Sequence, residues 1–348
     1  MKVLVTGASG HIGGNVVREL IAAGHAPVAL VRRSSNCEGL AGLTLQLVEG
    51  DVLDEASISG ALAGVDAVIH CAANFAMWSK DPDVVLRPAL AGTRNLFAAA
   101  ARAGVKRVVY TSSAIAVGVS SRPDELRAES DWFDDPTVPY YQAKVQSERL
   151  AIELAERCGV PIVVLLPTLV LGAHDYRITP SMRPVLDIAN GKQPTIEGGA
   201  NVVSVRDVAR AHVAALDRGT PGERYLIGGE NVSLIELGAM IGEFTGTTPG
   251  HLRLPRWAFK GAAGLMEIAA AVTGKAPGIT RAAVNDIFGK YGWVDCAKAR
   301  GALGLEPARA AAVVAETLSW LLLRGKLEPK VAHRVRAALP SEHLRPAA

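Results

Sequence analysis

The sequence predicts an α/β protein with a doubly wound parallel sheet, followed by a smaller, mostly helical C-terminal domain. Three observations indicate this class. Segments rich in valine, isoleucine and leucine alternate with amphipathic segments over the first 170 residues, the first turn is rich in glycine, and the later pattern is irregular and then mainly helical. Such alternation is typical of a parallel sheet with helices on both faces.

The chain opens with a strand, a glycine-rich turn and a helix. Residues 3–6 are apolar or β-branched, glycines occupy positions 7, 10 and 13, and residues 15–23 form an amphipathic run. Glycine permits a tight turn, close approach of the backbone to a ligand, and close packing of helix on sheet. The N–H groups and dipole at a helix start favour a phosphate. We expect this turn to bind the pyrophosphate of a dinucleotide through Gly7, Gly10, His11, Ile12 and Gly13.

The composition excludes several classes of protein. The 348 residues carry 37 lysines and arginines against 34 aspartates and glutamates, which is too balanced for a nucleic-acid partner. The four cysteines are scattered and the histidines lack metal-ligand spacing, so we expect neither a disulfide framework nor a metal site. The first residues lead directly into a strand, so we expect no signal peptide and a cytoplasmic location.

Further strands and helices complete the predicted sheet. The expected strands are 26–31, 43–48, 67–71, 107–110 and 161–166, and the expected helices are 57–63, 84–103 and 140–158. Ligands of parallel sheets bind beyond the carboxyl ends of the strands. The residues at those ends that we expect to contact a cofactor are Asp51, Val52, Ala72, Ala73 and Thr111.

The residues after the second strand indicate which dinucleotide is bound. A site for NAD(H) usually places an acidic residue about 20 residues past the glycines, where it binds the ribose 2′-hydroxyl. No acid occurs between Glu19 and Glu38, and Arg32 and Arg33 stand in that place. Because guanidinium groups suit a 2′-phosphate, we expect NADP(H) rather than NAD(H).

A serine, a tyrosine and a lysine form the predicted catalytic group. Tyr140 and Lys144 are four residues apart and share one face of a helix, and Ser113 follows the fifth strand. We expect the lysine charge to lower the pKa of the phenol, and the serine hydroxyl to orient a substrate oxygen. The neighbouring Tyr141 is a weaker candidate because the residue four positions on is Val145.

Three motifs together resemble the extended short-chain dehydrogenase/reductase family. They are T-G-x-x-G-x-x-G at 6–13, Y-T-S-S-A at 110–114 and Y-Y-Q-A-K at 140–144, and the likeness covers about residues 1–325. The resemblance implies a Rossmann sheet, a catalytic triad of Ser113, Tyr140 and Lys144, and adenine contact by Asp51. It also implies 2′-phosphate contact by Arg32 and nicotinamide contact by the segment that contains Pro167 and Val170. Family members often pair through two long helices, which implies a homodimer formed by 84–103 and 140–158.

Other motifs resemble one branch of that family. P-T-L-V-L-G at 167–172 and V-R-R-S at 31–34 are similar to the dihydroflavonol 4-reductase-like branch, and G-E-R-Y-L-I-G-G-E-N at 222–231 is similar to its bacterial members, which include hopanoid-associated sugar epimerases. Three positions depart from the family. Ala89 and Pro167-Thr168 stand where asparagines are usual, and the run after Ser113 lacks the asparagine of plant flavonoid reductases.

The predicted domains interleave along the chain. We assign 1–170 and 202–228 to the dinucleotide-binding domain, 171–201 and 229–325 to the substrate-binding domain, and 326–348 to a basic tail. The apolar run 257–273 is too short to cross a membrane and is interrupted by two charges. We expect it to form a lid over a small apolar substrate, with contact to a membrane surface as the alternative.

Three functions follow from these features. The first is an NADP(H)-dependent reductase or alcohol dehydrogenase acting on a fairly apolar small molecule. The second is a nucleotide-sugar epimerase or dehydratase that retains NAD, and the missing asparagine after the sixth strand counts against it. The third is a non-catalytic protein on the same fold, which the complete triad counts against.

Overall fold

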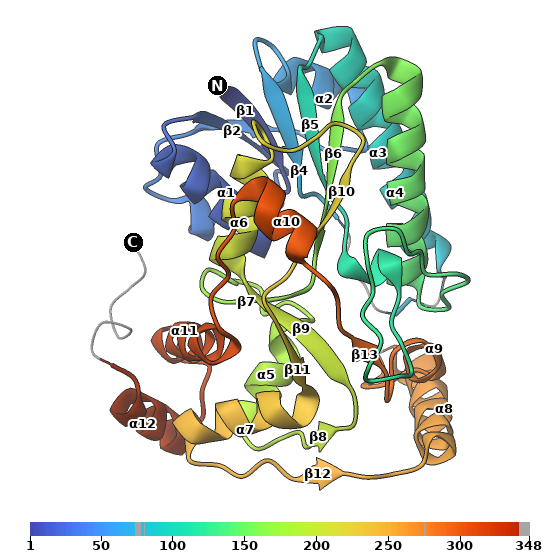
Figure 1. The fold of residues 1–348 in the computed structure, drawn as a ribbon, viewed down its shortest axis with the longest axis vertical. Helices are drawn as coiled ribbons and strands as arrows, with labels where there is room; N and C mark the ends of the chain where they lie inside the picture. The colour runs from blue at the N-terminus through green and yellow to red at the C-terminus, as the bar shows by residue number, and fades with distance from the viewer. Residues whose placement is uncertain (74–77, 80, 275, 341–348) are drawn as a thin grey trace.

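A seven-stranded parallel sheet forms the centre of the larger half of the molecule (Figure 1). The computed structural model describes residues 1–73, 78–79, 81–274 and 276–340. The strand order is β10-β6-β5-β4-β1-β2-β3, which is a doubly wound arrangement. The strands are β1 (Lys2–Thr6), β2 (Ala26–Val31), β3 (Gln46–Glu49), β4 (Ala67–His70), β5 (Arg107–Thr111), β6 (Ile162–Pro167) and β10 (Arg224–Ile227).

Helices cover both faces of this sheet. One face carries α1 (His11–Ala22) and α6 (Val205–Ala214), and the other carries α2 (Glu55–Ala61), α3 (Asp83–Ala103) and α4 (Pro139–Cys158). Alternate residues of a strand point to opposite faces. Leu4 therefore packs in the cluster of α2, α3 and α4, whereas Val3 and Val5 pack in the cluster of α1 and α6. Burial on both faces explains the continuous apolar strands of the sequence.

The smaller half combines short strands with helices. Its sheet contains β7 (Leu169–Leu171), β9 (Gly199–Ser204), β11 (Glu230–Ser233) and β13 (Tyr291–Gly292), and a second pair joins β8 (Thr195–Ile196) to β12 (His251–Leu252). The helices α5 (Met182–Ala189), α7 (Leu234–Thr245), α11 (Ala310–Leu323) and α12 (Pro329–Ala338) share one core with β7, β9 and β11. The helix α10 (Ala297–Leu303) packs beside β10.

Two further helices lie at the lower right of Figure 1, away from that core. They are α8 (Arg256–Thr273) and α9 (Arg281–Asp286), and they share a small cluster of their own around Phe259, Ala263 and Val284. In the part of the chain that the structure describes, no helix is long and apolar enough to cross a membrane.

The predicted fold class is confirmed, and several predicted bounds are corrected. The third strand begins at Gln46 rather than at residue 43, and α2 begins at Glu55 because Asp54 caps it by accepting from the Ala56 amide at 3.0 Å. Residues 202–204 belong to β9 in the smaller sheet, so the chain returns to the main sheet with α6 and β10. The division into two interleaved domains otherwise stays a prediction.

The predicted basic tail contains a packed helix. In α12, Val331 and Val335 are buried in the core of the smaller half, at 7% and 0% exposure. Basic residues lie on the exposed positions of this helix, and composition alone does not reveal its amphipathic pattern. Residues 341–348 of the predicted tail lie outside the described residues.

Candidate active site

Two glycines of the turn are packed too closely for a side chain. Gly7 has φ +68°, and a Cβ on it would lie 2.7 Å from the Ala72 nitrogen at the end of β4. A Cβ on Gly13 would lie 2.3 Å from the Gly7 carbonyl oxygen. The close contact of α1 with the sheet therefore depends on glycine at these two positions.

The N-terminus of α1 is suited to bind an anion. Gly10 is its N-cap and supplies no capping side chain, and the first turn contains no acidic residue. The amide groups of this turn and the helix dipole therefore favour a phosphate at this end. A dinucleotide pyrophosphate fits this end of the helix, because no side chain of the turn competes for the amides.

The side chain of His11 is engaged within the protein. Its ring Nε2–H donates to the Ala173 carbonyl at 3.0 Å, and the Asn15 amide donates to the same carbonyl at 3.3 Å. Burial lowers the pKa of His11, so the ring is neutral near pH 7. These two side chains attach the glycine turn to the segment after β7, and only the backbone of His11 remains available for a phosphate.

The strand ends place the other predicted cofactor residues along one edge of the sheet. Thr6 pairs with both Leu30 and His70, and His70 pairs with Tyr110, so β1, β2, β4 and β5 end at the same level. Arg32 and Arg33 follow β2 and are exposed, Ala72 and Ala73 follow β4, and Asp51 and Val52 follow β3. The Asp51 carboxylate accepts from the Leu53 amide at 3.0 Å.

Ser113 and Tyr140 meet at this edge. The Ser113 hydroxyl is hydrogen-bonded to Tyr140 and accepts from the Ile115 amide at 3.3 Å, at the start of a short 3₁₀ turn. Burial raises the pKa of Tyr140 to about 12, and the Ser113 hydrogen bond acts in the opposite direction. The expectation that Lys144 lowers the pKa of this phenol is therefore wrong.

Lys144 is directed at the end of β5. Its side chain is buried at 8% exposure, and Nζ donates to the Thr111 carbonyl at 3.0 Å. Burial lowers the pKa of Lys144 to about 8, while the nearby Glu148 carboxylate raises it. The ammonium group is thus mainly cationic at pH 7. The Thr111 hydroxyl is also engaged, because it bonds Nε2 of His212 at 2.8 Å.

Glu148 connects α4 to the sheet, a role that the sequence did not indicate. It is fully buried, and its Oε1 lies 2.6 Å from Nε of Arg224 on β10. The Ser112 hydroxyl donates to its other oxygen, and the Arg224 guanidinium stacks 3.8 Å from the centre of the Trp132 ring. We call these four side chains the Glu148 network. Burial raises the pKa of Glu148, and the charge of Arg224 opposes this shift.

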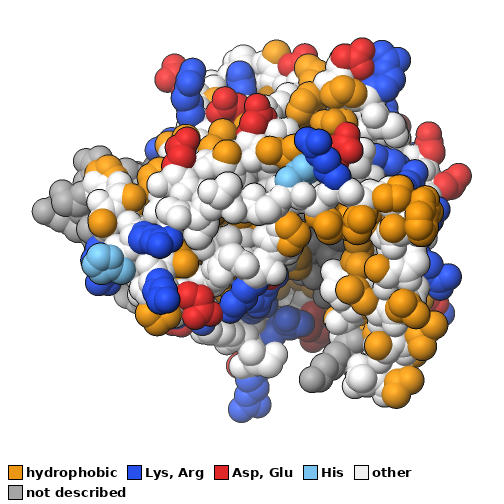
Figure 2. Space-filling view, turned by 90° about the horizontal axis from the view of Figure 1, so that it is seen from below, with side chains coloured by type: hydrophobic (Ala, Val, Ile, Leu, Met, Phe, Trp, Pro, Cys, Tyr) orange, Lys and Arg blue, Asp and Glu red, His pale blue; other side chains and the backbone are white. Residues whose placement is uncertain are grey.

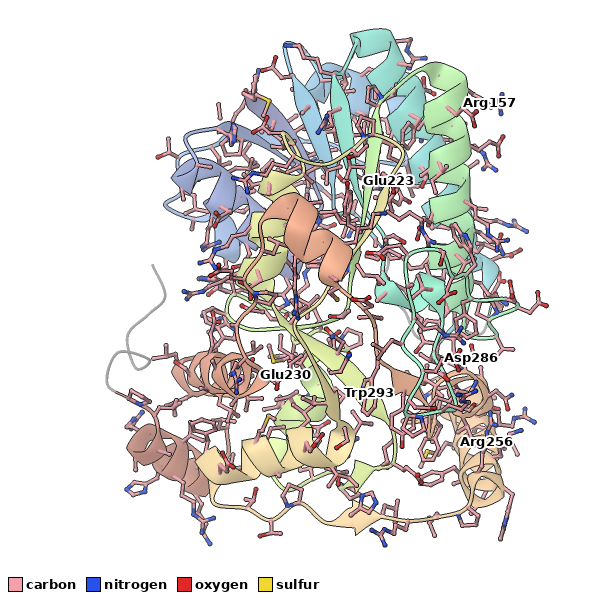
Figure 3. The ribbon with its side chains drawn as sticks, in the orientation of Figure 1. Arg157, Glu223, Glu230, Arg256, Asp286 and Trp293 are labelled. Atoms are coloured by element: carbon pink, nitrogen blue, oxygen red, sulfur yellow. The ribbon has the colours of Figure 1, made fainter. Side chains whose placement is uncertain are left out.

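Asp286 holds the first turn of α4 from the other half of the molecule. Its carboxylate accepts from the amides of Thr137 and Val138 at 2.7 and 2.8 Å, and from the Thr137 hydroxyl at 2.7 Å. Val138 is the N-cap of α4 and has no capping side chain, so Asp286 caps this helix from α9. Figure 3 shows Asp286 beside the segment that leads into α4. We call this the Asp286 contact.

The apolar segment after β6 belongs to the core. Val170 and Leu171 are exposed by 7% and 0% and pack in the two large clusters of their regions. Thr168 is also engaged, since its amide donates to the Ile227 carbonyl at 3.1 Å and its hydroxyl bonds Asn201 at 3.0 Å. The burial of Val170 in this core does not support cofactor contact by its side chain, whereas Pro167 ends β6 at the edge of the sheet.

His70 and residues of the segment 174–176 make contacts within the protein. His70 bonds Thr6 at 2.8 Å and stacks on Tyr110, and burial lowers its pKa to about 3. The Asp175 carboxylate accepts from the amide and the hydroxyl of Thr179. Tyr176 packs edge-on against Trp320 at 5.0 Å. Among the residues that the structure describes, no cluster of metal-ligating side chains occurs.

Comparison with known proteins defines the class of this chain. Residues 3–228 match the model of the NAD-dependent epimerase/dehydratase family, so the chain belongs to this family. That assignment confirms the predicted resemblance and makes the chain an oxidoreductase of this superfamily, whose members bind NAD(P).

Several curated relatives are reductases. The chain is 34% identical over 334 residues to sterol demethylase protein B of Methylococcus capsulatus, covering 94% of this chain and 100% of the relative. It is 35% identical over 257 residues to cinnamoyl-CoA reductase 1 of Oryza sativa subsp. japonica, covering 69% of this chain and 75% of the relative. It is 30% identical over 260 residues to dihydroflavonol 4-reductase of Zea mays, covering 69% of this chain and 73% of the relative.

Solved structures show the same fold over almost the whole chain. The structure of gox2253 has a TM-score of 0.82 at 33% identity, covering 94% of this chain and 99% of that one. A nucleoside-diphosphate-sugar epimerase from Pseudomonas aeruginosa has a TM-score of 0.74 at 28% identity, covering 94% of this chain and 99% of that one.

Proposed function

We propose that this chain is an NADP(H)-dependent oxidoreductase that interconverts a carbonyl and a secondary alcohol on a fairly apolar substrate. One observation carries the proposal. The hydroxyl of Ser113 is hydrogen-bonded to Tyr140, and Lys144 lies one helical turn further on, at the sheet edge that also holds the glycine turn. The reductases named among its relatives support an apolar substrate with a carbonyl group.

The three candidate catalytic residues have separate tasks. When bound, the nicotinamide cofactor supplies or accepts the hydride. Ser113 orients the substrate oxygen by a hydrogen bond, and Tyr140 holds the proton that this oxygen gains or loses. Because the pKa of Tyr140 is about 12, the phenol is protonated at neutral pH and acts as a proton donor.

Lys144 supplies positive charge on the same helix. Its pKa of about 8 keeps the ammonium group cationic at pH 7, and its burial limits screening by water. A cation one helical turn from Tyr140 helps to offset the negative charge that Tyr140 acquires when it donates its proton. The Thr111 carbonyl, which accepts from Nζ at 3.0 Å, keeps the ammonium group at the end of β5.

The preference for NADP(H) rests on the end of β2. Arg32 and Arg33 are exposed there, next to β1 and the glycine turn. Their guanidinium groups suit the two negative charges of a 2′-phosphate, and no acidic side chain follows β2 before Glu38 to bind a 2′-hydroxyl.

The direct test is carbonyl-dependent consumption of NADPH with a panel of apolar ketones and aldehydes. Tyr140→Phe removes the proton donor, so we expect kcat to fall by roughly 10²–10⁴. Tyr141→Phe is the matched control, since Tyr141 is a buried neighbour on the same helix. Equal losses in both variants, or full activity of Tyr140→Phe, would refute the assignment.

A second candidate is a nucleotide-sugar epimerase that retains NAD. The similarity to the Pseudomonas aeruginosa epimerase favours it. Protein purified without added cofactor distinguishes the two. Release of stoichiometric NAD on denaturation, with turnover of a nucleotide sugar and no net consumption of NADPH, supports the epimerase.

We also propose a homodimer formed by α3 and α4, in a cytoplasmic protein. The two helices pack side by side on one face of the sheet, and Leu150 and Leu154 on α4 are only half-buried in the single chain. Light scattering after gel filtration tests this. Leu150→Lys is expected to yield a monomer, whereas a monomeric wild type contradicts the proposal.

A further inference from the structure

The helix α8 presents a stripe of large apolar side chains to solvent. Trp257, Leu265, Ile268 and Val272 are exposed by 76%, 72%, 66% and 84%. Their spacing of eight, three and four residues places them on one face of the helix. In Figure 2, hydrophobic side chains form a column on the right, where α8 lies in Figure 1. Single exposed apolar residues are ordinary, but a continuous stripe marks a site of interaction.

The other face of α8 holds the helix in place. Phe259 and Ala263 are buried with Val284, and the rings of Phe259 and Phe288 lie 3.8 Å apart. The apolar stripe is therefore not needed for packing. The prediction of an enclosed lid over the substrate is not supported, because these side chains face solvent.

Positive charge gathers at the N-terminal end of α8. A groove of about 240 Å³ there is lined by Arg253, Arg256 and Lys290, with Glu197 as its acidic residue and leucine and phenylalanine side chains between them. Figure 3 shows Arg256 on this side of the molecule. Burial lowers the pKa of Lys290, and the charges of Arg256 and Arg127 act in the same direction, whereas the Asp286 carboxylate opposes them.

Two acidic side chains of this region are already engaged with other groups. Glu267 on α8 is paired with Arg281 at 2.7 Å, and Asp286 is occupied by the Asp286 contact. Lys260, one turn into α8, is exposed and adds to the positive charge. An anionic surface therefore complements this end of the helix.

We propose that α8 docks on the surface of an anionic phospholipid bilayer. The stripe inserts among the acyl chains with the helix lying in the plane of the membrane, and the basic groove binds headgroup phosphates. A second copy of the chain fits less well, because it brings the same positive charges. The stripe is also one side chain wide and about 22 Å long, which is small for a stable dimer interface.

Vesicle flotation without cofactor or substrate tests this proposal independently of the reaction. We use vesicles of phosphatidylcholine alone and of an equal mixture of phosphatidylcholine and phosphatidylglycerol. Wild type is expected to bind the mixed vesicles, and added salt is expected to weaken the binding. Ile268→Gln/Val272→Gln should weaken it by about tenfold or more, because two large side chains no longer enter the membrane.

Two further variants separate the contributions. Arg253→Gln/Lys260→Gln should abolish the preference for phosphatidylglycerol. Ile235→Gln on α7 is the matched control, since Ile235 is 44% exposed and lies outside the stripe, and it should bind as wild type does. All the substituted side chains are exposed, so the variants should fold normally.

Three results overturn the proposal. One is absence of wild-type binding to the mixed vesicles. Another is equal binding by wild type and Ile268→Gln/Val272→Gln. The third is a dimer, seen in the absence of lipid, that this double variant abolishes, which would assign the stripe to a second copy of the chain.

Discussion

Two buried carboxylates hold the helix α4, and they do so in different ways. Glu148 is paired with the guanidinium of Arg224 and lies within the main sheet domain, whereas Asp286 accepts from two amides and a hydroxyl and belongs to the α8–α9 pair. A fully buried ion pair is integral to the fold, because neither charge can be left without its partner. A helix cap is replaceable at a smaller cost.

This difference separates the two tasks of the site. The Glu148 network positions Ser112 and the turn of α4 that contains Lys144. Both lie at the edge of the sheet where we propose that the cofactor binds. The Asp286 contact holds the turn that carries Tyr140, and it comes from the half of the molecule expected to bind substrate. We therefore expect changes in the Glu148 network to affect folding and changes in the Asp286 contact to affect catalysis.

The largest effect is expected for Glu148→Ala. It leaves the Arg224 charge buried without its partner, so the free energy of unfolding should fall by about 3–5 kcal/mol. Denaturant unfolding measures this. Glu148→Leu/Arg224→Met replaces both charges by apolar groups and should restore most of the stability. If the single variant is as stable as wild type, the network is not integral to the fold.

The next effect concerns pH and Lys144. Its pKa is lowered from 10.5 to about 8 in the folded protein, so the unfolded state binds more protons between these values. Stability should therefore rise with pH through this window, by at most about 3 kcal/mol. The difference in unfolding free energy between wild type and Lys144→Met, followed from pH 7 to 10.5, isolates the group. A flat difference would mean that Lys144 is not desolvated.

Asp286→Asn should have the smallest effect on stability. The amide keeps one acceptor oxygen, so we expect a loss of about 1 kcal/mol. The amides of Thr137 and Val138 should exchange faster with solvent, and kcat/KM should fall while cofactor affinity is unchanged. Asp124→Asn, at an exposed ion pair with Arg122, is the control. Unchanged exchange at both amides would contradict the capping role.

Local patterns were enough to predict the fold class and to bring the candidate site residues to one edge of the sheet. The glycine turn, the strand ends and the Tyr140–Lys144 spacing each lie within a few residues of sequence, and periodicity identifies the strands and helices. The predicted helix bounds were wrong where a capping residue determines the first residue of the helix, as Asp54 does for α2.

Long-range partners could not be predicted in the same way. Arg224 lies 76 residues after Glu148, and Asp286 lies 149 residues after Thr137, and no spacing rule joins them. The error over the pKa of Tyr140 has the same origin. Lys144 donates to the Thr111 carbonyl. The pKa of Tyr140 is raised mainly by burial of the phenol, and a single sequence does not reveal this burial. The apolar residues 170 and 171 likewise belong to the core rather than to a pocket.

Titration calorimetry with NADPH and NADH, on wild type and on Arg32→Ala, tests the proposed cofactor and function most directly. We predict that wild type binds NADPH more tightly, and that Arg32→Ala weakens NADPH binding by about 10- to 100-fold while NADH binding is unchanged. Arg87→Ala, an exposed arginine on α3, should change neither affinity. Equal affinities in wild type, or protein that is purified with NAD already bound, would contradict the reductase and favour the epimerase.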